Sequence, residues 1–208
     1  MKVEAVMNRE VITISEKATI ENGLKCMKEH RIRHLPVVTE KDKLVGIVSD
    51  RDLIDWKSSN GDTTIAQIGS VMTEDVITAH PREFIEELLS IFYDERIGSI
   101  PVVENEQVVG IMTERDMLYT LIQLTGAHQP SSQIEVQVEN VSGQLAEVTA
   151  VIKKHKVNIT SVLVYPEQTD QKKVLVLRVQ TMNPQTIIES LRAEGYNVIW
   201  PAIPGEKV

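Results

Sequence analysis

Two hydroxyl residues are each followed three positions later by an aspartate, and these pairs are the strongest candidates for chemistry. They are Ser49 with Asp52 and Thr113 with Asp116. An ionised carboxylate accepts hydrogen bonds from two donors, so each aspartate suits the vicinal hydroxyls of a ribose. Where such a segment opens a helix, free backbone N–H groups and the helix dipole favour a phosphate. The same pattern also caps helices without any ligand, so both interpretations stay open.

Four basic side chains could supply local positive charge for such a phosphate. Arg51 and Arg115 lie inside the two segments, and Arg33 and His34 precede a short apolar strand. Elsewhere acid prevails, because 22 Lys and Arg face 30 Asp and Glu, a net charge of −8 that residues 1–126 carry entirely. This balance argues against sequence-independent binding to nucleic acid or to an anionic membrane surface.

The candidate segments occur twice because the first part of the chain is an internal repeat. Val6-Met7 recurs 65 positions later as Val71-Met72, and residues 46–52 match residues 110–116. Each copy predicts a β-α-β-β-α order, in which the first strands are expected at residues 11–14 and 76–79. The apolar helix positions are either core or a contact face, and they are Ile20, Leu24, Met27, Leu88, Leu89 and Phe92.

A different pattern follows a segment rich in Gly, Pro and Ser at residues 125–132, which predicts a linker. Residues 134–138 alternate as a half-buried strand, and a helix and two β-branched strands come next. Asn183, Pro184 and Gly195 have the spacing of an N-cap, a first helical position and a helix end. With a last strand near Trp200, residues 133–208 predict a ferredoxin-like β-α-β-β-α-β order.

The repeat resembles a CBS domain, and the tandem copies resemble a CBS pair (Bateman module). This rests on the paired Gly-h-h-Ser/Thr-x-x-Asp and h-Pro-Val-Val segments, where h is apolar. The resemblance implies domains at residues 1–60 and 61–124, a homodimer formed through the helices, and a regulatory adenine nucleotide. AMP, ADP, ATP, NAD, S-adenosylmethionine and a cyclic dinucleotide stay open as its identity. The resemblance also implies that the backbone near Thr13 and Thr78 and the strand residues near Val37 and Val102 line the adenine. The expected nucleotide-binding residues are Thr13, His34, Val37, Ser49, Arg51, Asp52, Thr78, Val102, Thr113, Arg115 and Asp116.

Residues 138–146 resemble the signature of an ACT domain. Asn140 and Gly143 lead from the first strand towards the helix, and Asn158 stands where amino-acid-binding members often carry a second polar residue. The chain departs from the family at Ser142, where Pro is usual, and at Val138, where some serine-binding members have a polar residue. The implied ligand is an amino acid or another small metabolite, and a turn or strand-end role for the three residues stays open.

Catalytic and metal chemistry find little support. His30 and His34 have the spacing of a helical metal pair, but Pro36 predicts that the helix ends near Arg31. Cys26 is interpreted as a small buried residue, and no nucleophile, base or metal ligand is assigned. A lone cysteine fits a reducing compartment, and with no apolar run of 18 residues we expect a cytoplasmic protein.

The sequence therefore predicts an α/β (α+β) chain with two CBS domains and an ACT domain. This order is similar to that of AcuB-type acetoin-utilisation proteins. The expected function is that of a non-enzymatic sensor in acetoin or carbon utilisation, with no nucleic acid or membrane as partner. The alternative is a ligand-independent dimeric adaptor that presents a surface to a partner enzyme.

Overall fold

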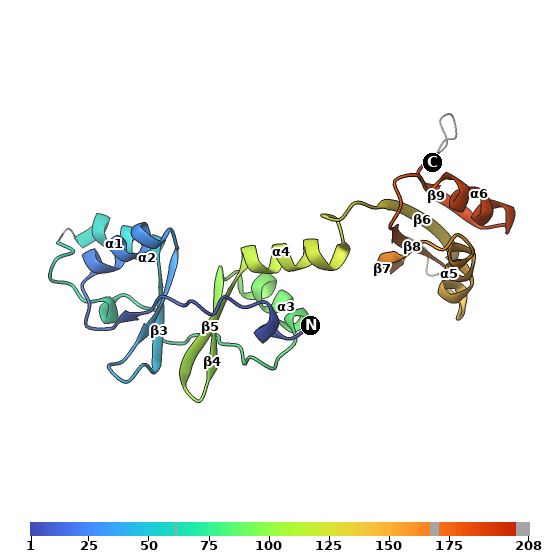
Figure 1. The fold of residues 1–208 in the computed structure, drawn as a ribbon. Helices are drawn as coiled ribbons and strands as arrows, with labels where there is room; N and C mark the ends of the chain where they lie inside the picture. Colours follow the sequence, from blue (N-terminus) through green and yellow to red (C-terminus); the bar gives the residue numbers. More distant parts are fainter. Residues whose placement is uncertain (61, 167–170, 203–208) are drawn as a thin grey trace. The chain divides into compact units, whose positions relative to one another are not determined.

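The computed structural model describes residues 1–60, 62–166 and 171–202. It separates into two compact units, Met1–Tyr119 and Thr120–Val208. The first unit contains both repeats and two hydrophobic clusters, and the second unit contains one. Figure 1 shows the order of the elements along the chain.

The first repeat forms a three-stranded sheet with two helices. Its strand order is β1-β2-β3, with β1 parallel to β2 and β2 antiparallel to β3. The elements are η1 (Val3–Ala5, a 3-10 helix), β1 (Ile14–Ser15), α1 (Ile20–His30), β2 (His34–Val38), β3 (Leu44–Ser49) and α2 (Asp50–Asn60).

The second repeat has the same order but a two-stranded sheet. Its elements are η2 (Ile68–Ser70, a 3-10 helix), α3 (Ile85–Glu95), β4 (Ser99–Glu104), β5 (Gln107–Thr113) and α4 (Glu114–Thr125). The expected strand at residues 76–79 is a single parallel bridge between Ala79 and Val102. The expected strand at residues 11–14 is wrong in the same way, because only Ile14 and Ser15 lie against β2.

The predicted end of the first helix is confirmed. α1 ends at His30, and Arg31 adopts the left-handed conformation with φ 55°, as Arg96 does after α3 with φ 54°. His34 is the first residue of β2, so the helix does not carry His30 and His34 on one face. Cys26 is half-buried rather than buried.

The segment that leads into each repeat packs in the other repeat. Val3 and Met7 belong to the core of the second repeat, and Ile68 belongs to the core of the first. The N–H of Val3 donates to the carbonyl of Glu83 at 2.9 Å, and Figure 1 places the N-terminus near α3. The leading segments of the two repeats therefore cross, and each packs in the core of the other repeat. The local pattern of the sequence does not indicate this crossing.

Two glycines make room for this crossing. A Cβ atom on Gly46 of β3 would lie 2.5 Å from Met72 Sδ and 3.0 Å from the carbonyl oxygen of Thr73. A Cβ atom on Gly110 of β5 would likewise lie 2.5 Å from Met7 Sδ. Each methionine thus occupies the space that a side chain on the opposite repeat's strand would need.

The apolar helix positions are mostly core. Ile20, Met27, Leu88 and Phe92 are buried, whereas Leu89 of α3 is 40% exposed. The interpretation of these residues as core therefore holds for the four buried ones, and a contact face has to be built from other side chains.

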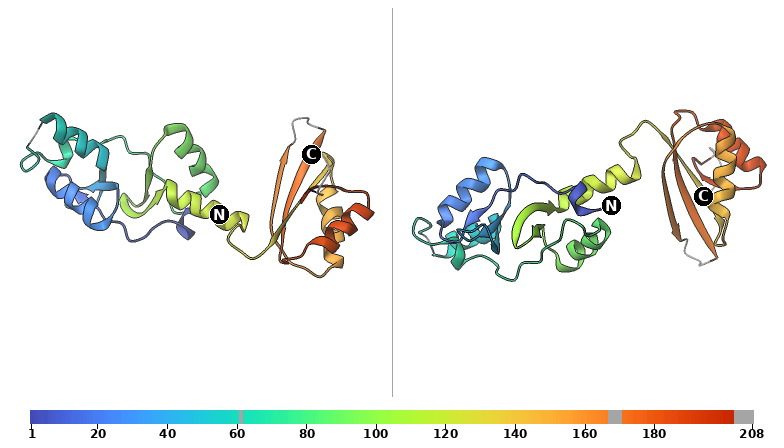
Figure 2. Two further views of the ribbon diagram at one scale, coloured as in Figure 1. Left: turned by 90° about the horizontal axis from the view of Figure 1, so that it is seen from above. Right: turned by 60° about the horizontal axis from the view of Figure 1, so that its bottom comes forward.

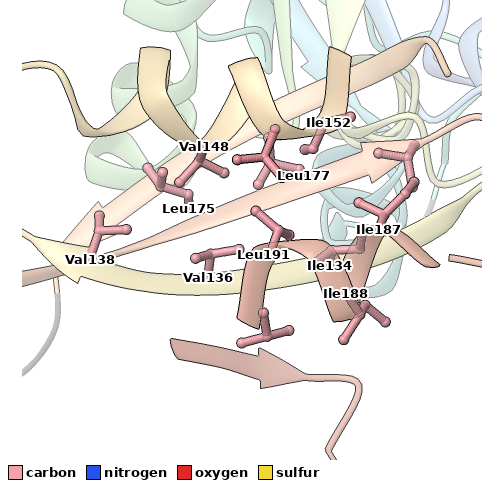
Figure 3. Packing of buried hydrophobic residues seen from close by; sticks show 13 residues of the cluster. Ile134, Val136, Val138, Val148, Ile152, Leu175, Leu177, Ile187, Ile188 and Leu191 are labelled. Carbon is pink, nitrogen blue, oxygen red and sulfur yellow. The ribbon is translucent and has the colours of Figure 1, made fainter. Parts of the chain in front are cut away.

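The second unit has the predicted β-α-β-β-α-β order, which confirms the ferredoxin-like arrangement. Its antiparallel sheet has the strand order β7-β8-β6-β9. Figure 2 shows both helices on one face of this sheet, and Figure 3 shows their apolar side chains meeting those of the strands. The elements are β6 (Ser132–Glu139), α5 (Gln144–Lys154), β7 (Ile159–Pro166), β8 (Lys172–Val179), α6 (Gln185–Ala193) and β9 (Asn197–Trp200).

The predicted end of α6 is confirmed, but its start lies one residue later than predicted, because Pro184 is the N-cap and Gln185 is the first helical residue. Asn183 Oδ1 accepts a hydrogen bond from the N–H of Gln185 at 3.1 Å, and Gly195 has a φ of 90° just beyond the helix. Among the described residues, no helix is long and apolar enough to cross a membrane.

The crossing predicts a partner-specific rescue. Gly46→Ala and Gly110→Ala should each lower the free energy of unfolding by about 1–3 kcal/mol, because each new methyl group overpacks its site. Met72→Ala should recover part of the loss in Gly46→Ala, and Met7→Ala should do so in Gly110→Ala. Urea unfolding measures the stability of each glycine variant combined with each methionine variant. Rescue of Gly46→Ala by Met7→Ala, or of Gly110→Ala by Met72→Ala, would contradict the crossed packing.

Candidate ligand-binding site

Both Ser/Thr-x-x-Asp segments form reciprocal capping boxes. Asp52 Oδ2 accepts hydrogen bonds from the N–H of Ser49 at 2.8 Å and from Ser49 Oγ at 2.7 Å, and the N–H of Asp52 donates to Ser49 Oγ at 3.2 Å. Thr113 and Asp116 repeat these bonds at 2.9, 2.6 and 3.3 Å. The capping interpretation of the motif is therefore correct for both copies, and it fixes the orientation of both carboxylates.

The start of α2 does not offer the free N–H groups that the sequence led us to expect. The N–H of Asp50 donates to the carbonyl of Arg33 at 2.9 Å, and the N–H of Arg51 donates to Asp50 Oδ1 at 2.9 Å. With the capping box, all four N–H groups from Ser49 to Asp52 have protein acceptors. The negative charges of the acidic side chains in this first turn also offset the positive end of the helix dipole. An anion must therefore be held here by side chains.

Two cavities open beside the two capping boxes. The first has a volume of about 450 Å³ and the second about 590 Å³, both within the usual range for small-molecule sites. Cavity 1 is lined by Arg33, His34, Ile47, Ser49, Asp50, Arg51, Asp52, Arg96, Ile97, Gly98, Ser99 and Glu114. Cavity 2 is lined by Asn8, Glu10, Val11, Ile12, Arg31, Ile32, Arg33, His34, Gly98, Ile111, Thr113, Glu114, Arg115, Asp116 and Leu118.

Residues of both repeats line each cavity, and the crossed leading segment of the first repeat contributes to cavity 2. Asn8, from the leading segment of the first repeat, exchanges backbone hydrogen bonds of 3.0 and 2.9 Å with Ile111 of β5. This places Asn8 and Val11 in cavity 2 together with Asp116 of the second repeat. A ligand at either aspartate would therefore contact both halves of the pair.

Each cavity also contains three arginines. Arg51 and Arg115, which the sequence singled out, line cavity 1 and cavity 2 respectively, and Arg33 lines both. Sequence reasoning missed Arg96 in cavity 1 and Arg31 in cavity 2. Both follow a helix in the same left-handed conformation, and their matched positions in the repeat are the signal that could have found them.

His34 lies on the wall that the two cavities share, against Gly98. A Cβ atom on Gly98 would be 2.8 Å from His34 Cε1 and 3.0 Å from its Nε2. Burial lowers the pKa of His34 below its ordinary value of 6.5, and the charge of Arg33 acts in the same direction. The negative charges of Asp50, Asp52 and Glu114 raise this pKa but do not outweigh burial.

Four residues expected around the adenine lie outside these two cavities. The side chains of Val37 and Val102 are fully buried in the cores of the first and second repeat. Thr13 is exposed just before β1, and Thr78 lines a separate cavity of about 380 Å³. Alternation along β2 and β4 explains the two valines, because successive side chains point to opposite faces of the sheet.

The structure places Asn140 and Gly143 in one connection, between β6 and α5, and Asn158 at the opposite end of the sheet. Asn140 follows β6, and Gly143, with a φ of 92°, stands just before α5. Asn158 precedes β7, and its carbonyl accepts from the N–H of Gln180 at 2.8 Å. Because Ser132 and Ile159 both pair with Val179, Asn158 lies at the end of the sheet where β6 begins. Asn140 lies where β6 ends, so one copy of the domain does not bring these side chains together.

Comparison with known families assigns the chain to a class. The profile of the CBS domain matches residues 3–59 and 68–123, and the profile of the ACT domain matches residues 132–195. The two CBS matches cover more than half of the chain. The chain belongs to the CBS domain family and carries a C-terminal ACT domain.

Similar curated proteins share the CBS part. Inosine-5'-monophosphate dehydrogenase of Methanocaldococcus jannaschii is 36% identical over 118 residues, which are 56% of this chain and 23% of the dehydrogenase. Hypoxic response protein 1 of Mycobacterium tuberculosis is 28% identical over 113 residues, which are 54% of this chain and 79% of that protein. The chain thus spans less than a quarter of the dehydrogenase.

Solved structures show the same relationship. One is named as an acetoin utilization protein (AcuB) from Vibrio cholerae; it is 32% identical with a TM-score of 0.57 and covers 64% of this chain and 98% of its own. The CBS domain pair of protein MJ0100, solved with 5'-methylthioadenosine and S-adenosyl-L-methionine, is 30% identical with a TM-score of 0.55. It covers 62% of this chain and 98% of its own.

The lowered pKa of His34 predicts a loss of stability in mild acid. Below pH 6.5 the unfolded chain takes up a proton at this residue that the folded chain does not, so the free energy of unfolding falls as the pH drops towards the lowered value. His34→Gln should make this fall shallower. Urea unfolding from about pH 7.5 to about pH 5.5 measures both proteins, and parallel curves would contradict the prediction.

Proposed function

We propose that this chain is a non-enzymatic regulatory protein whose CBS pair binds an adenosine-type ligand, namely an adenine nucleotide such as AMP, ADP or ATP. The observation that carries the proposal is the coincidence of a fixed carboxylate and three arginines in each of two cavities of suitable volume. A ribose would bind at Asp52 or Asp116, and a phosphate would bind to the arginine side chains.

The carboxylate of Asp52 retains capacity for the ribose. A carboxylate has about four acceptor positions, and Ser49 uses two of them, both at Oδ2. Two vicinal hydroxyls would need two more. Because the capping box already holds the side chain in one orientation, little conformational entropy would be lost on binding.

The phosphate would rely on Arg33, Arg51 and Arg96 in cavity 1, since the N–H groups at the start of α2 are occupied. Charge-assisted hydrogen bonds from guanidinium groups are the stronger kind, and they are often bidentate to phosphate. Three acidic residues line the same cavity and also attract the arginines. An anionic ligand would compete for them.

The relatives support the ligand class and the regulatory role. The CBS pair of protein MJ0100, 30% identical, was solved with two adenosine-containing ligands. The dehydrogenases match this chain only over its CBS part, which favours a regulatory module over an enzyme. The likeness to AcuB supports a role in acetoin or carbon utilisation, and the matched ACT domain supports a second small ligand, with Asn140, Gly143 and Asn158 as its predicted contacts.

A homodimer in the cytoplasm completes the proposal. Leu89 and Tyr93, one turn apart on α3, are 40% and 84% exposed, and Leu118 of α4 is 60% exposed. Leu89 and Tyr93 share one face of α3 because of their spacing, and a dimer would cover this face. Sedimentation velocity can measure whether the chain is a dimer. The lone cysteine fits a reducing compartment such as the cytoplasm.

Removing either aspartate should weaken its own cavity. A hydrogen bond to a charged group contributes about 1.5–3 kcal/mol, so Asp52→Ala or Asp116→Ala should reduce AMP affinity at that site by roughly one to two orders of magnitude. Calorimetric titration of the intact chain with AMP measures this effect.

Thr19→Ala is the matched control, because Thr19 caps α1 through a 3.2 Å hydrogen bond from the N–H of Asn22, outside both cavities. It should lower stability by about 1 kcal/mol and leave AMP affinity unchanged. Unaltered affinity in both aspartate variants would overturn the proposed sites. If AMP, ADP and ATP all fail to stabilise the chain, the adaptor alternative is favoured, because a ligand at a hundred times its Kd should add about 2.7 kcal/mol.

A further inference from the structure

The two cavities are neighbours that share one wall. Arg33, His34, Gly98 and Glu114 line cavity 1 and cavity 2 alike. At the centre of this wall the imidazole of His34 rests on Gly98, where a Cβ atom would come within 2.8 Å of the ring.

The repeat is asymmetric at this wall. Arg33 and His34 of the first repeat correspond to Gly98 and Ser99 of the second. The basic groups on the wall therefore come from one repeat only and serve both cavities. On the side of the second repeat, Ser99 lines cavity 1, and its buried Oγ has no hydrogen-bond partner among the residues that the structure describes. This uncommitted hydroxyl is a polar group that an occupant of cavity 1 could satisfy.

The wall is also bonded to both helices that carry the aspartates. The carbonyl of Arg33 accepts from the N–H of Asp50, the first residue of α2, at 2.9 Å. The carbonyl of Gly98 accepts from the N–H of Glu114, the first residue of α4, at 3.3 Å. A shift of His34 against Gly98 would thus be passed to the first residue of each helix through one backbone hydrogen bond.

We propose that His34 and Arg33 form a single anion-binding centre shared by the two cavities, so that an anionic ligand in one cavity weakens the binding of a second anion in the other. The inference rests on the proposed function and adds its regulation. When one phosphate draws the imidazole and the guanidinium towards its own cavity, the second loses these partners and meets the charge of the first. A neutral adenosine-type ligand has no phosphate to attract the imidazole and the guanidinium. Two molecules of such a ligand therefore bind independently.

Calorimetric titration with AMP tests the coupling. Asp52→Ala and Asp116→Ala each isolate one cavity. The weaker isolated cavity should bind AMP about tenfold more tightly than the wild-type chain binds its second AMP, a typical size for coupling between sites. With 5'-methylthioadenosine, which has no phosphate, this difference should stay within about twofold, the statistical factor for two equal sites.

His34→Gln should reduce the tenfold difference for AMP to about twofold. The matched control is His30→Gln, since His30 ends α1 outside both cavities, and it should keep the full difference. A wild-type chain that takes up one AMP, when both single-cavity variants also take up one, would show the same coupling in a stronger form.

Three results would overturn the inference. In the first, the wild type binds its second AMP as tightly as the weaker isolated cavity binds AMP. In the second, His34→Gln leaves the difference between these two affinities unchanged. In the third, 5'-methylthioadenosine gives the same difference as AMP. If the wild type binds one AMP and one of the two aspartate variants binds none, only one cavity is a site, and the inference is overturned as well. A wild-type chain that binds no AMP would instead refute the nucleotide part of the proposed function, so the two failures are distinguishable.

Discussion

One packing constraint joins the two repeats, which is that the segment leading into each repeat lies against a glycine of the other repeat. Met7 occupies the space in front of Gly110, and Met72 occupies the space in front of Gly46. Close-packed interiors tolerate little change in volume, so these two contacts fix where the leading segments run. Asn8 and Val11 reach cavity 2 because of this path. The candidate sites are thus a property of the pair, and a single repeat would lack part of each wall.

Electrostatics sets the second condition on the sites. Residues 1–126 carry the whole net charge of −8, yet three arginines gather in each cavity. Since the first N–H groups of α2 are already bonded within the protein, the helix start contributes little to an anion. Specificity for a phosphate would come from the guanidinium and imidazole groups that line the cavities. This arrangement makes the shared wall at His34 important for both cavities.

Much of the fold follows from the sequence, and particular residues show why. The duplication of Gly, Pro and Asp at matched positions predicts the repeated β-α-β-β-α order, and the alternation of residues 134–138 predicts β6. The placement of Gly195 predicts the end of α6, and Asn183 predicts its start to within one residue. These features depend on local periodicity and turn chemistry, which a single sequence displays.

The features that depend on long-range contacts could not be predicted in this way. No local pattern reveals that Val3 packs in the second repeat or that Gly98 faces His34. The capping box was foreseen as one of two interpretations, but the acceptors of the N–H groups of Asp50 and Arg51 depend on Arg33 and on a rotamer of Asp50. The aspartates and Arg51 reach the cavities as expected, whereas Val37 and Val102 are buried in the cores because the pleat of each strand turns them inward.

A crystal structure of the full chain grown with AMP would show where the nucleotide binds. We expect ribose hydroxyls within about 3 Å of a carboxylate oxygen of Asp52 or Asp116, with the phosphate against the arginines of the same cavity and the capping boxes intact. AMP bound away from both aspartates, or cavities that stay empty at saturating AMP, would contradict this expectation.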